Sequence, residues 1–473
     1  MPMPADTALI ANQRFMPDWL KFGFLVTFIF VACWGGAIAY WRTTGGNPAA
    51  GDLLLYLFGA PACLLLVLYT GRKLITRRIA TPAAAASPAA TKAIVTPPQT
   101  MSLAILAASL RLPHGASPEE LASAIAGNKA RADLDKELTD EDGFPIMTAR
   151  SSEAVDEALQ EEISEWLALN GMAELHFSDE QWRAITLASA VVAELAAQAA
   201  GQIPHQTGAQ TTLKLIPQSP AEWDIAHRRA VGMWLKQMAA QYDWPADRIM
   251  LNAEEVGGTA DVSPAAIFNR LAPNGVAMGA PFVAMIVACS SNIGDVTIAR
   301  WAAEGSLFTS SQPHGRIPGE GAAGLLVTSQ AGLADGAAIA LLDGIEEAHR
   351  DSSADEAKRT DAKLLGELSE HALKRSGINA ADVAMLIADT GPRASRVLEL
   401  MAHVSTGLPQ LDETRDVVRL GVASGTCDGV PFITALALGR HYVLEREAPV
   451  LCISNEDPVH RMVVLLHPSE AAP

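Results

Sequence analysis

Three short polar segments carry the residues of this 473-residue chain that could do chemistry. The segment Cys289–Asn292 directly follows the apolar run Phe282–Ala288. Asp389 follows a second apolar run, and Thr426 lies in the glycine-rich loop 425–429. A thiol between a strand and a helix can act as a nucleophile, because the helix N-terminus stabilises its thiolate. The first chemistry to weigh for this chain is therefore nucleophilic catalysis by a cysteine.

The elements around Cys289 must position that thiol. The run Phe282–Ala288 is long enough for a strand buried on both faces, and Ile293–Ala303 has helical spacing. A loop over Gly305–Pro318 then leads to Gly319-Glu320-Gly321 and to the apolar run Leu325–Val327. A strand–helix–loop–strand unit of this kind predicts a layered α/β domain.

Parts of the chain resemble one enzyme family. The segment IPGEGAAGLLV resembles the glycine-rich turn and strand of β-ketoacyl-ACP synthases, members of the thiolase-like superfamily, and ACSS resembles their nucleophile motif. The strand predicted at Met101–Ala108 also resembles the family's opening, which continues with an R-x-P loop and an S-x-E-E helix. The matching residues there are Arg111, Pro113, Ser117, Glu119 and Glu120. The resemblance implies a thiolase-like layered α/β/α domain over residues 101–468.

The catalytic groups of that family do not align with this sequence. These enzymes need a cysteine at a strand-to-helix elbow and two histidines that stabilise developing negative charge. Asp389 stands where the family has the histidine of A-H-G-T-G, and Thr426 stands where it has that of G-H-x-x-G-A-A-G. Cys289 aligns with the end of a later strand, and the elbow falls at Gly257–Ser263, which contains no cysteine. We therefore predict a protein that is not an enzyme and has no catalytic residues, with Cys289 as a buried structural thiol.

Other catalytic patterns are weaker. Ser290, His314 and Asp295 could be drawn as a triad, but the sequence has no GxSxG elbow. The segment GEGAAG is not a phosphate loop, because no Lys-Ser or Lys-Thr follows it; its glycines favour a close approach of two backbones.

Metal, cofactor and nucleic-acid binding are not indicated. The histidines show no shared metal spacing: His114, His205, His314, His349 and His403. Five scattered cysteines without CxxC predict neither a zinc site nor a disulfide framework, which fits a reducing compartment. The formal net charge of −18 argues against nucleic acid as a partner. We expect no metal and no cofactor.

The remaining elements alternate between helices and strands. The acidic stretch Asp133–Asp142 is expected to be a solvated loop. Strands are expected at Thr211–Ile216, Ala337–Leu342, Val383–Ala388, Asp416–Leu420, Val450–Ser454 and Met462–His467. Helices are expected within Ser152–Gly201 and at Pro220–Gln241, Pro264–Leu271 and Asp361–Ser376.

Two apolar runs without charged residues lie near the N-terminus, at Phe22–Trp41 and Leu53–Thr70. Each is about 27–30 Å long as a helix, which matches the hydrocarbon core of a bilayer. A signal peptide followed by a buried helix is the alternative, but the first run is too long for it and no cleavage pattern follows. Residues 1–78 are therefore predicted to form a transmembrane hairpin, with helices at about 22–41 and 53–70.

Positive charge predicts the orientation of this hairpin. Arg42 is the only cation between the two helices, whereas four follow the second one: Arg72, Lys73, Arg77 and Arg78. By the positive-inside rule the domain after the hairpin faces the cytoplasm of a bacterial inner-membrane protein. Residues 79–100, rich in Ala, Pro and Thr, are predicted to be an extended tether.

The whole arrangement looks like the type VI lipase adaptor family of Gram-negative bacteria. The matching features are the N-terminal membrane segment, LPHGAS, ELTDEDGFP, the helical segment with tryptophans, GRIPGEGAAGLLV, and ADTGPRASRVLEL followed by LD. The resemblance implies a membrane-anchored adaptor that binds a secreted lipase-like effector and the secretion spike protein. The second membrane segment is a departure from the family's pattern.

Two other functions stay open. A divergent acyltransferase or ketosynthase at the inner membrane would use Cys289 as its nucleophile. A scaffold that acts through self-association is the third class, and a homodimer fits every reading because thiolase-like domains commonly dimerise. Candidate binding surfaces are the acidic stretch Asp133–Asp142 and the loop Ser306–Arg316.

Overall fold

The computed structural model describes residues 102–202, 211–242, 244–251, 264–271, 282–329, 339–356 and 361–469, together with Trp34 and Arg42. The chain divides into two compact units, Met1–Val95 and Thr96–Pro473. Trp34 and Arg42 are both helical and exposed. Apart from these two positions, the expected membrane helices at 22–41 and 53–70 and the expected tether at 79–100 lie outside the described residues.

Among the described residues, one helix is long and apolar enough to cross a membrane. It is Asp179–Gly201, and 61% of its apolar window is buried inside the folded unit. This helix packs on the sheet of the second unit, as described below, so it carries no membrane assignment.

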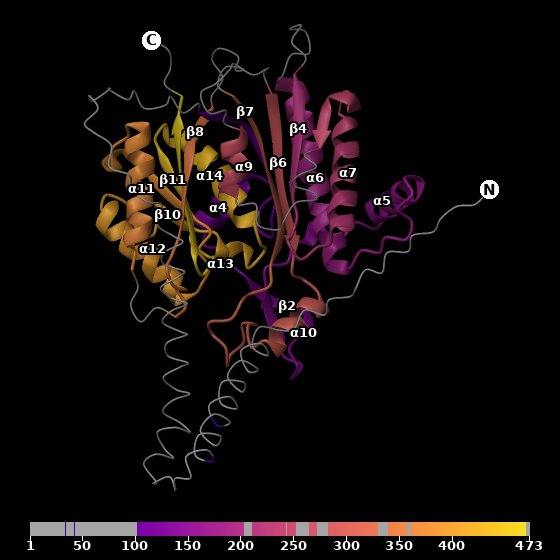
Figure 1. The fold of residues 1–473 in the computed structure, drawn as a ribbon, viewed down its shortest axis with the longest axis horizontal. Coiled ribbons are helices and arrows are strands. Elements are labelled where there is room, and N and C mark those ends of the chain that lie inside the picture. Colours follow the sequence, from indigo (N-terminus) through magenta and orange to yellow (C-terminus); the bar gives the residue numbers. More distant parts are fainter. Residues whose placement is uncertain are drawn as a thin grey trace, which may run out of the picture. The chain divides into compact units, whose positions relative to one another are not determined.

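A ten-stranded mixed sheet is the frame of the second unit (Figure 1). In spatial order its strands are β10 (Val417–Arg419), β9 (Met385–Ala388), β11 (Val450–Ser454), β12 (His460–Pro468), β8 (Ala340–His349), β1 (Leu103–Arg111), β7 (Glu320–Ser329), β6 (Phe282–Ser291), β4 (Thr212–Gln218) and β5 (Ile249–Leu251). At the centre β1 and β8 pair antiparallel, with Leu103 opposite Leu342.

The two halves of this sheet repeat one pattern. Strands β5, β4 and β6 are parallel, and β7 and β1 then continue antiparallel. Strands β10, β9 and β11 are likewise parallel, and β12 and β8 continue antiparallel. The helices that connect the strands correspond as well: α6 (Asp179–Gln202), α7 (Ile225–Ala240) and α9 (Pro264–Leu271) with α11 (Lys363–Ser376), α12 (Ala394–Gly407) and α14 (Val430–Arg446). The unit is therefore an internal duplication.

The layers follow from this duplication. Helices α6 and α7 lie on one side of the unit, α11 and α12 lie on the other, and α9 and α14 lie between the two halves of the sheet (Figure 1). Smaller elements complete the unit: α4 (Pro118–Ala126), α5 (Glu157–Leu169), α10 (Asp295–Ala303) and α13 (Gly421–Ser424). This arrangement is the layered α/β domain that the sequence predicts, with its sheet buried on both faces.

Successive residues of β6 pack into different cores, because successive side chains of a strand point to opposite faces. Ala284, Ile286 and Ala288 belong to the hydrophobic core around α14. The residues between them, from Val283 to Cys289, belong to the core formed with α6 and α7. The strand is buried along its whole length, so its near-continuous apolar sequence matches its place in the sheet.

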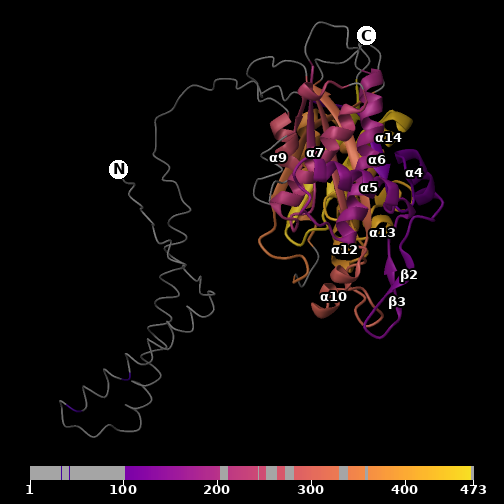
Figure 2. The ribbon, with the colours of Figure 1, turned by 90° about the vertical axis from the view of Figure 1, so that its right-hand side faces the viewer.

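The prediction of a solvated loop at Asp133–Asp142 is wrong. Strands β2 (Asp133–Thr139) and β3 (Pro145–Thr148) pair there as an antiparallel hairpin, which lies with α10 at one end of the unit (Figure 2). Asp135 is buried and accepts hydrogen bonds from Thr148 Oγ1 at 2.6 Å and Arg150 Nε at 2.9 Å. Burial opposes the charge on Asp135, but these bonds outweigh it and hold the pKa of that carboxyl well below its usual range.

Three element boundaries also differ from expectation. Strand β6 continues through Ser291, beyond the apolar run Phe282–Ala288, so Cys289 and Ser290 belong to the strand. Strand β8 runs on to His349, where it still pairs with β12. Helix α7 begins at Ile225, because the Asp224 carboxylate caps the backbone N–H of His227 at 2.8 Å.

Candidate functional site

A cavity of about 830 Å³ lies where several loops of the two halves meet. Its walls come from the loop after β9, the loop before α14, the β11–β12 connection, the end of β8, the loop before β7 and the first residue of α9. Asp389 and Thr426, which the alignment places at the family's histidine positions, both line it. Its volume falls in the range of small-molecule sites.

Asp389 directly follows β9 and is 8% exposed. Its carboxylate accepts three hydrogen bonds, from Ser454 Oγ at 2.5 Å and from the backbone N–H groups of Asn455 and Glu456 at 2.8 and 3.1 Å. Burial raises the pKa of Asp389, although these donors favour its ionised form. The side chain therefore ties β9 to the β11–β12 connection, and all three of these bonds use its oxygens as acceptors.

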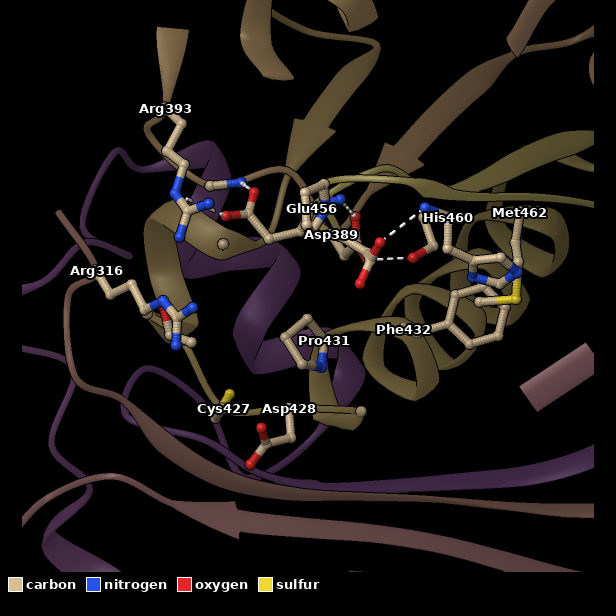
Figure 3. Close-up of a pocket in the computed structure, with 18 of the residues that line it drawn as sticks. Arg316, Asp389, Arg393, Cys427, Asp428, Pro431, Phe432, Glu456, His460 and Met462 are labelled. Carbon is tan, nitrogen blue, oxygen red and sulfur yellow. Dashed lines mark hydrogen bonds and ion pairs between the residues drawn. The ribbon is translucent and has the colours of Figure 1, made fainter. Parts of the chain in front are cut away.

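Glu456 is a second carboxylate on the same wall (Figure 3). Its Oε2 accepts the backbone N–H of Gly391 at 2.7 Å, and Arg393 Nε lies 3.6 Å from its Oε1. Burial and the neighbouring Asp389 raise the pKa of Glu456, and the hydrogen bond from Gly391 opposes that shift. Glu456 and Asp389 are thus neighbouring carboxyl groups beside the cavity.

Thr426 fixes the loop before α14 through its backbone. Its N–H donates to Ile317 O at 2.8 Å, and its carbonyl accepts from Gly319 N at 3.2 Å and from Asn292 Nδ2 at 2.8 Å. These bonds join the loop 425–429 to the segment that enters β7. The position therefore has a structural use that does not depend on its side chain.

Asp428 follows in the same loop with a left-handed backbone, φ 47°. Its Oδ2 accepts the hydroxyl of Ser290 at 2.5 Å, which joins the loop to the end of β6. Asp428 is exposed and lines the cavity, and partial desolvation of its carboxylate there raises the pKa of Asp428. Non-glycine residues held in this conformation often lie at functional sites.

Glycines permit the close contact between the segment that enters β7 and the loop before α14, as the sequence predicted for GEGAAG. A Cβ at Gly319 would lie 1.9 Å from the carbonyl oxygen of Ser424, and one at Gly321 would lie 2.4 Å from a methyl carbon of Leu112. On the opposite side Gly425 has φ 62°, which favours glycine. The segment before β7 and the loop before α14 can approach only because neither has a side chain here.

Cys289 does not face the cavity. It is 4% exposed and belongs to the core with α6 and α7, on the side of β6 away from α14. Burial and the nearby Asp428 raise the pKa of its thiol to about 12. A buried thiol at this pKa is protonated at neutral pH, which matches the expected structural thiol rather than an activated nucleophile.

The alternative triad is not assembled. Asp428 holds the hydroxyl of Ser290, and within the described ranges no contact joins Ser290 to His314 or Asp295. His314 and Asp295 are both exposed.

The strand-to-helix elbow of the resembled family corresponds to the connection between β5 and α9. That connection includes Gly257–Ser263, which lies outside the described residues. Pro264, the first residue of α9, lines the cavity, so the connection leads directly to this site.

The histidines do not form a metal site in the part of the chain that is described, where no group of three His, Cys, Asp or Glu could hold a metal ion. His403 is buried against Ser369 Oγ at 3.0 Å, and the His349 ring stacks on His460 at 4.7 Å between centroids. His349 and His460 line the cavity. His205 lies outside the described residues.

Sequence reasoning missed five Asp, Glu and Arg residues of the cavity: Glu347, Arg393, Asp428, Glu456 and Asp457. Asp428 lies two residues after Thr426 and Arg393 lies four after Asp389, so proximity in the sequence was the available signal. No such signal exists for Glu456, because nothing in its own segment indicates that it lies beside Asp389.

Comparisons with known proteins identify the fold. Neither a protein-family model nor a curated protein matches the sequence. Among solved structures, the oxazolomycin ketosynthase domain OzmH KS7 of Streptomyces albus JA3453 matches with a TM-score of 0.52 and 13% identity, over 79% of this chain and 75% of that chain. The ketosynthase from module 1 of the bacillaene synthase of Bacillus amyloliquefaciens FZB42 matches with a TM-score of 0.51 and 12% identity, over 79% of this chain and 74% of that one. The chain has the thiolase-like ketosynthase fold, and at this identity the likeness concerns the fold alone.

Proposed function

We propose that this chain is a non-catalytic binding protein that uses a ketosynthase-like fold as an adaptor. The observation that carries the proposal is the use of the two aligned positions. Asp389 accepts three hydrogen bonds that hold loops together, and Thr426 fixes the crossing of two segments through its backbone. Neither side chain supplies the N–H donor that an enolate or thioester oxygen requires.

As an adaptor, the chain would be anchored in a membrane and would bind two protein partners. On the resemblance to type VI lipase adaptors, the N-terminal hairpin anchors the chain as a multi-pass protein of the bacterial inner membrane. The domain then faces the cytoplasm, binds a secreted lipase-like effector and helps to load it onto the secretion spike protein. A homodimer is compatible with this role.

The rival reading is an acyltransferase that uses Cys289. Against it stand the burial of the thiol, its raised pKa and its position on the face of β6 away from the cavity. No observation in the described part of the chain favours it over the adaptor.

The test is a pull-down of the tagged full-length chain from its native host. The chain is solubilised in detergent, and partners are identified by mass spectrometry against an unrelated two-helix membrane protein as control bait. Stoichiometric enrichment of a lipase-like effector or a spike protein is the expected result. Enrichment of acyl carrier protein, an acyl mass on Cys289, or self-association without a secreted partner would overturn the adaptor.

A further inference from the structure

The cavity holds more negative than positive side chains. Five carboxylates line it against two guanidiniums, which leaves a surplus of three negative charges when all are ionised. The carboxylates are Glu347, Asp389, Asp428, Glu456 and Asp457, and the guanidiniums are Arg316 and Arg393. An anionic ligand would add to this surplus, whereas a cation would reduce it.

The two arginines do not neutralise the acids closely. The only pair between them and a lining carboxylate is the Arg393–Glu456 contact at 3.6 Å, beyond the length of a charge-assisted hydrogen bond. The guanidinium of Arg316 lies over the ring of Trp301, 5.5 Å from its centroid, and in the described ranges it makes no ion pair. Its charge and that of Arg300 lower the pKa of Asp428, against the larger effect of desolvation. Figure 3 shows both arginines on one side of the view and Asp389 and Glu456 in the middle.

Asp428 has a free oxygen. In the described part of the chain, its Oδ2 accepts the Ser290 hydroxyl and no donor reaches its Oδ1. The residue lines the cavity and is reached by solvent through it, although desolvation raises its pKa. A carboxylate oxygen that lines a cavity and lacks a donor can accept a charge-assisted hydrogen bond from a positively charged group.

An apolar wall lies next to this carboxylate. Pro431 stands directly above Asp428 in Figure 3, and Phe432 and Met462 lie together beyond it. All three line the cavity. Apolar surface of this kind suits the methylene stem of an alkylammonium ion, which it holds by dispersion.

We propose that this cavity binds an aliphatic amine, with the ammonium group on the carboxylate of Asp428 and the methylene chain against Pro431 and Phe432. The amine is either a free polyamine or the lysine side chain of a bound protein, because both present the same group. This proposal does not depend on the adaptor function: either can fail while the other stands.

The experiment titrates full-length protein in detergent with spermidine, with Nα-acetyl-lysine amide and with inorganic phosphate, using calorimetry. The variant is Asp428→Asn, which removes the charge, keeps an acceptor for Ser290 and tolerates the left-handed backbone. The matched control is Asp247→Asn, on the exposed turn before β5, which makes the same change in net charge away from the cavity. Thermal unfolding of each variant checks that it is folded.

The expected result is that an amine binds the wild type, and that Asp428→Asn weakens binding on the order of 10-fold to 100-fold, the loss of one charge-assisted bond. Asp247→Asn should leave binding unchanged. Preference for spermidine indicates a free polyamine, and preference for the lysine derivative indicates a side chain of a partner. Equal weakening by both substitutions, binding of phosphate in place of the amines, or no binding of either amine would overturn the proposal.

Discussion

Arg183 and Glu320 form a buried ion pair with two hydrogen bonds that joins α6 to the first residue of β7. Arg183 Nε lies 2.7 Å from Oε2 of Glu320, and Nη2 lies 2.6 Å from Oε1. The same carboxylate accepts the N–H of Ser151 at 2.7 Å and the hydroxyl of Ser291 at 2.9 Å. Glu320 thus connects α6, β6, β7 and the segment before α5, directly beside the glycine crossing.

Replacing Glu320 with Ala should destabilise the protein by about 3–5 kcal/mol, because Arg183 would keep a buried charge without a partner. The control is Glu222→Ala, which breaks an exposed pair with Arg300 and should cost about 0–1 kcal/mol. Urea unfolding of both variants measures the difference. Equal losses would mean that the buried pair contributes no more than a surface one.

The glycine crossing predicts a steric effect at Gly319. Gly319→Ala would place a methyl group 1.9 Å from the Ser424 carbonyl oxygen, so the two segments must separate. We expect a loss of about 3–5 kcal/mol, the range of severe single substitutions. In contrast, Gly366→Ala in α11 meets nothing within 4 Å and should stabilise by about 0.5–1 kcal/mol. Thermal unfolding of the pair distinguishes backbone contact from a general intolerance of substitution.

Thiol reactivity tests the position of Cys289. With a pKa of about 12, only about one thiol in ten thousand is ionised at pH 8, and the side chain is 4% exposed. Iodoacetamide should therefore label Cys289 in guanidinium but not in the native protein, as judged by peptide mass mapping. Rapid native labelling would contradict the buried placement and revive the acyltransferase.

His403 predicts a loss of stability in mild acid. Burial lowers the pKa of His403 to about 4, although the nearby Glu399 raises it. As pH falls from about 6.5 to about 4, the unfolded chain binds a proton at His403 and the folded chain does not, so the free energy of unfolding decreases by about 3 kcal/mol. Urea titrations at pH 7 and 4.5 should show a smaller decrease for His403→Gln than for the wild type. An identical pH dependence would mean that His403 is not held neutral.

Much of the fold follows from local patterns, and the site follows only in part. The apolar strands and amphipathic helices can be predicted from the residue pattern of single segments. Asp389 and Thr426 were found from the motifs that surround them. Asp428 and Glu456 acquire their roles from contacts with Ser290 and Gly391, which lie 138 and 65 residues away. No local pattern records such distant contacts.

The β2–β3 hairpin was missed for a different reason. Its acidic composition predicts a solvated loop, because carboxylates are rarely buried. Arg150 and Thr148 compensate the one buried member, Asp135, and these partners come later in the chain.

During synthesis at the ribosome, β1 must wait for β8 before the two strands can pair. Ser102 bonds to Asp343, 241 residues further along the chain. At about 5–20 residues per second the partner emerges roughly 10–50 seconds after β1 does. During that interval both long edges of this apolar strand lack their final neighbours, since β7 is also made late. A newly made chain of this protein should therefore depend on a holding chaperone until its second half has emerged.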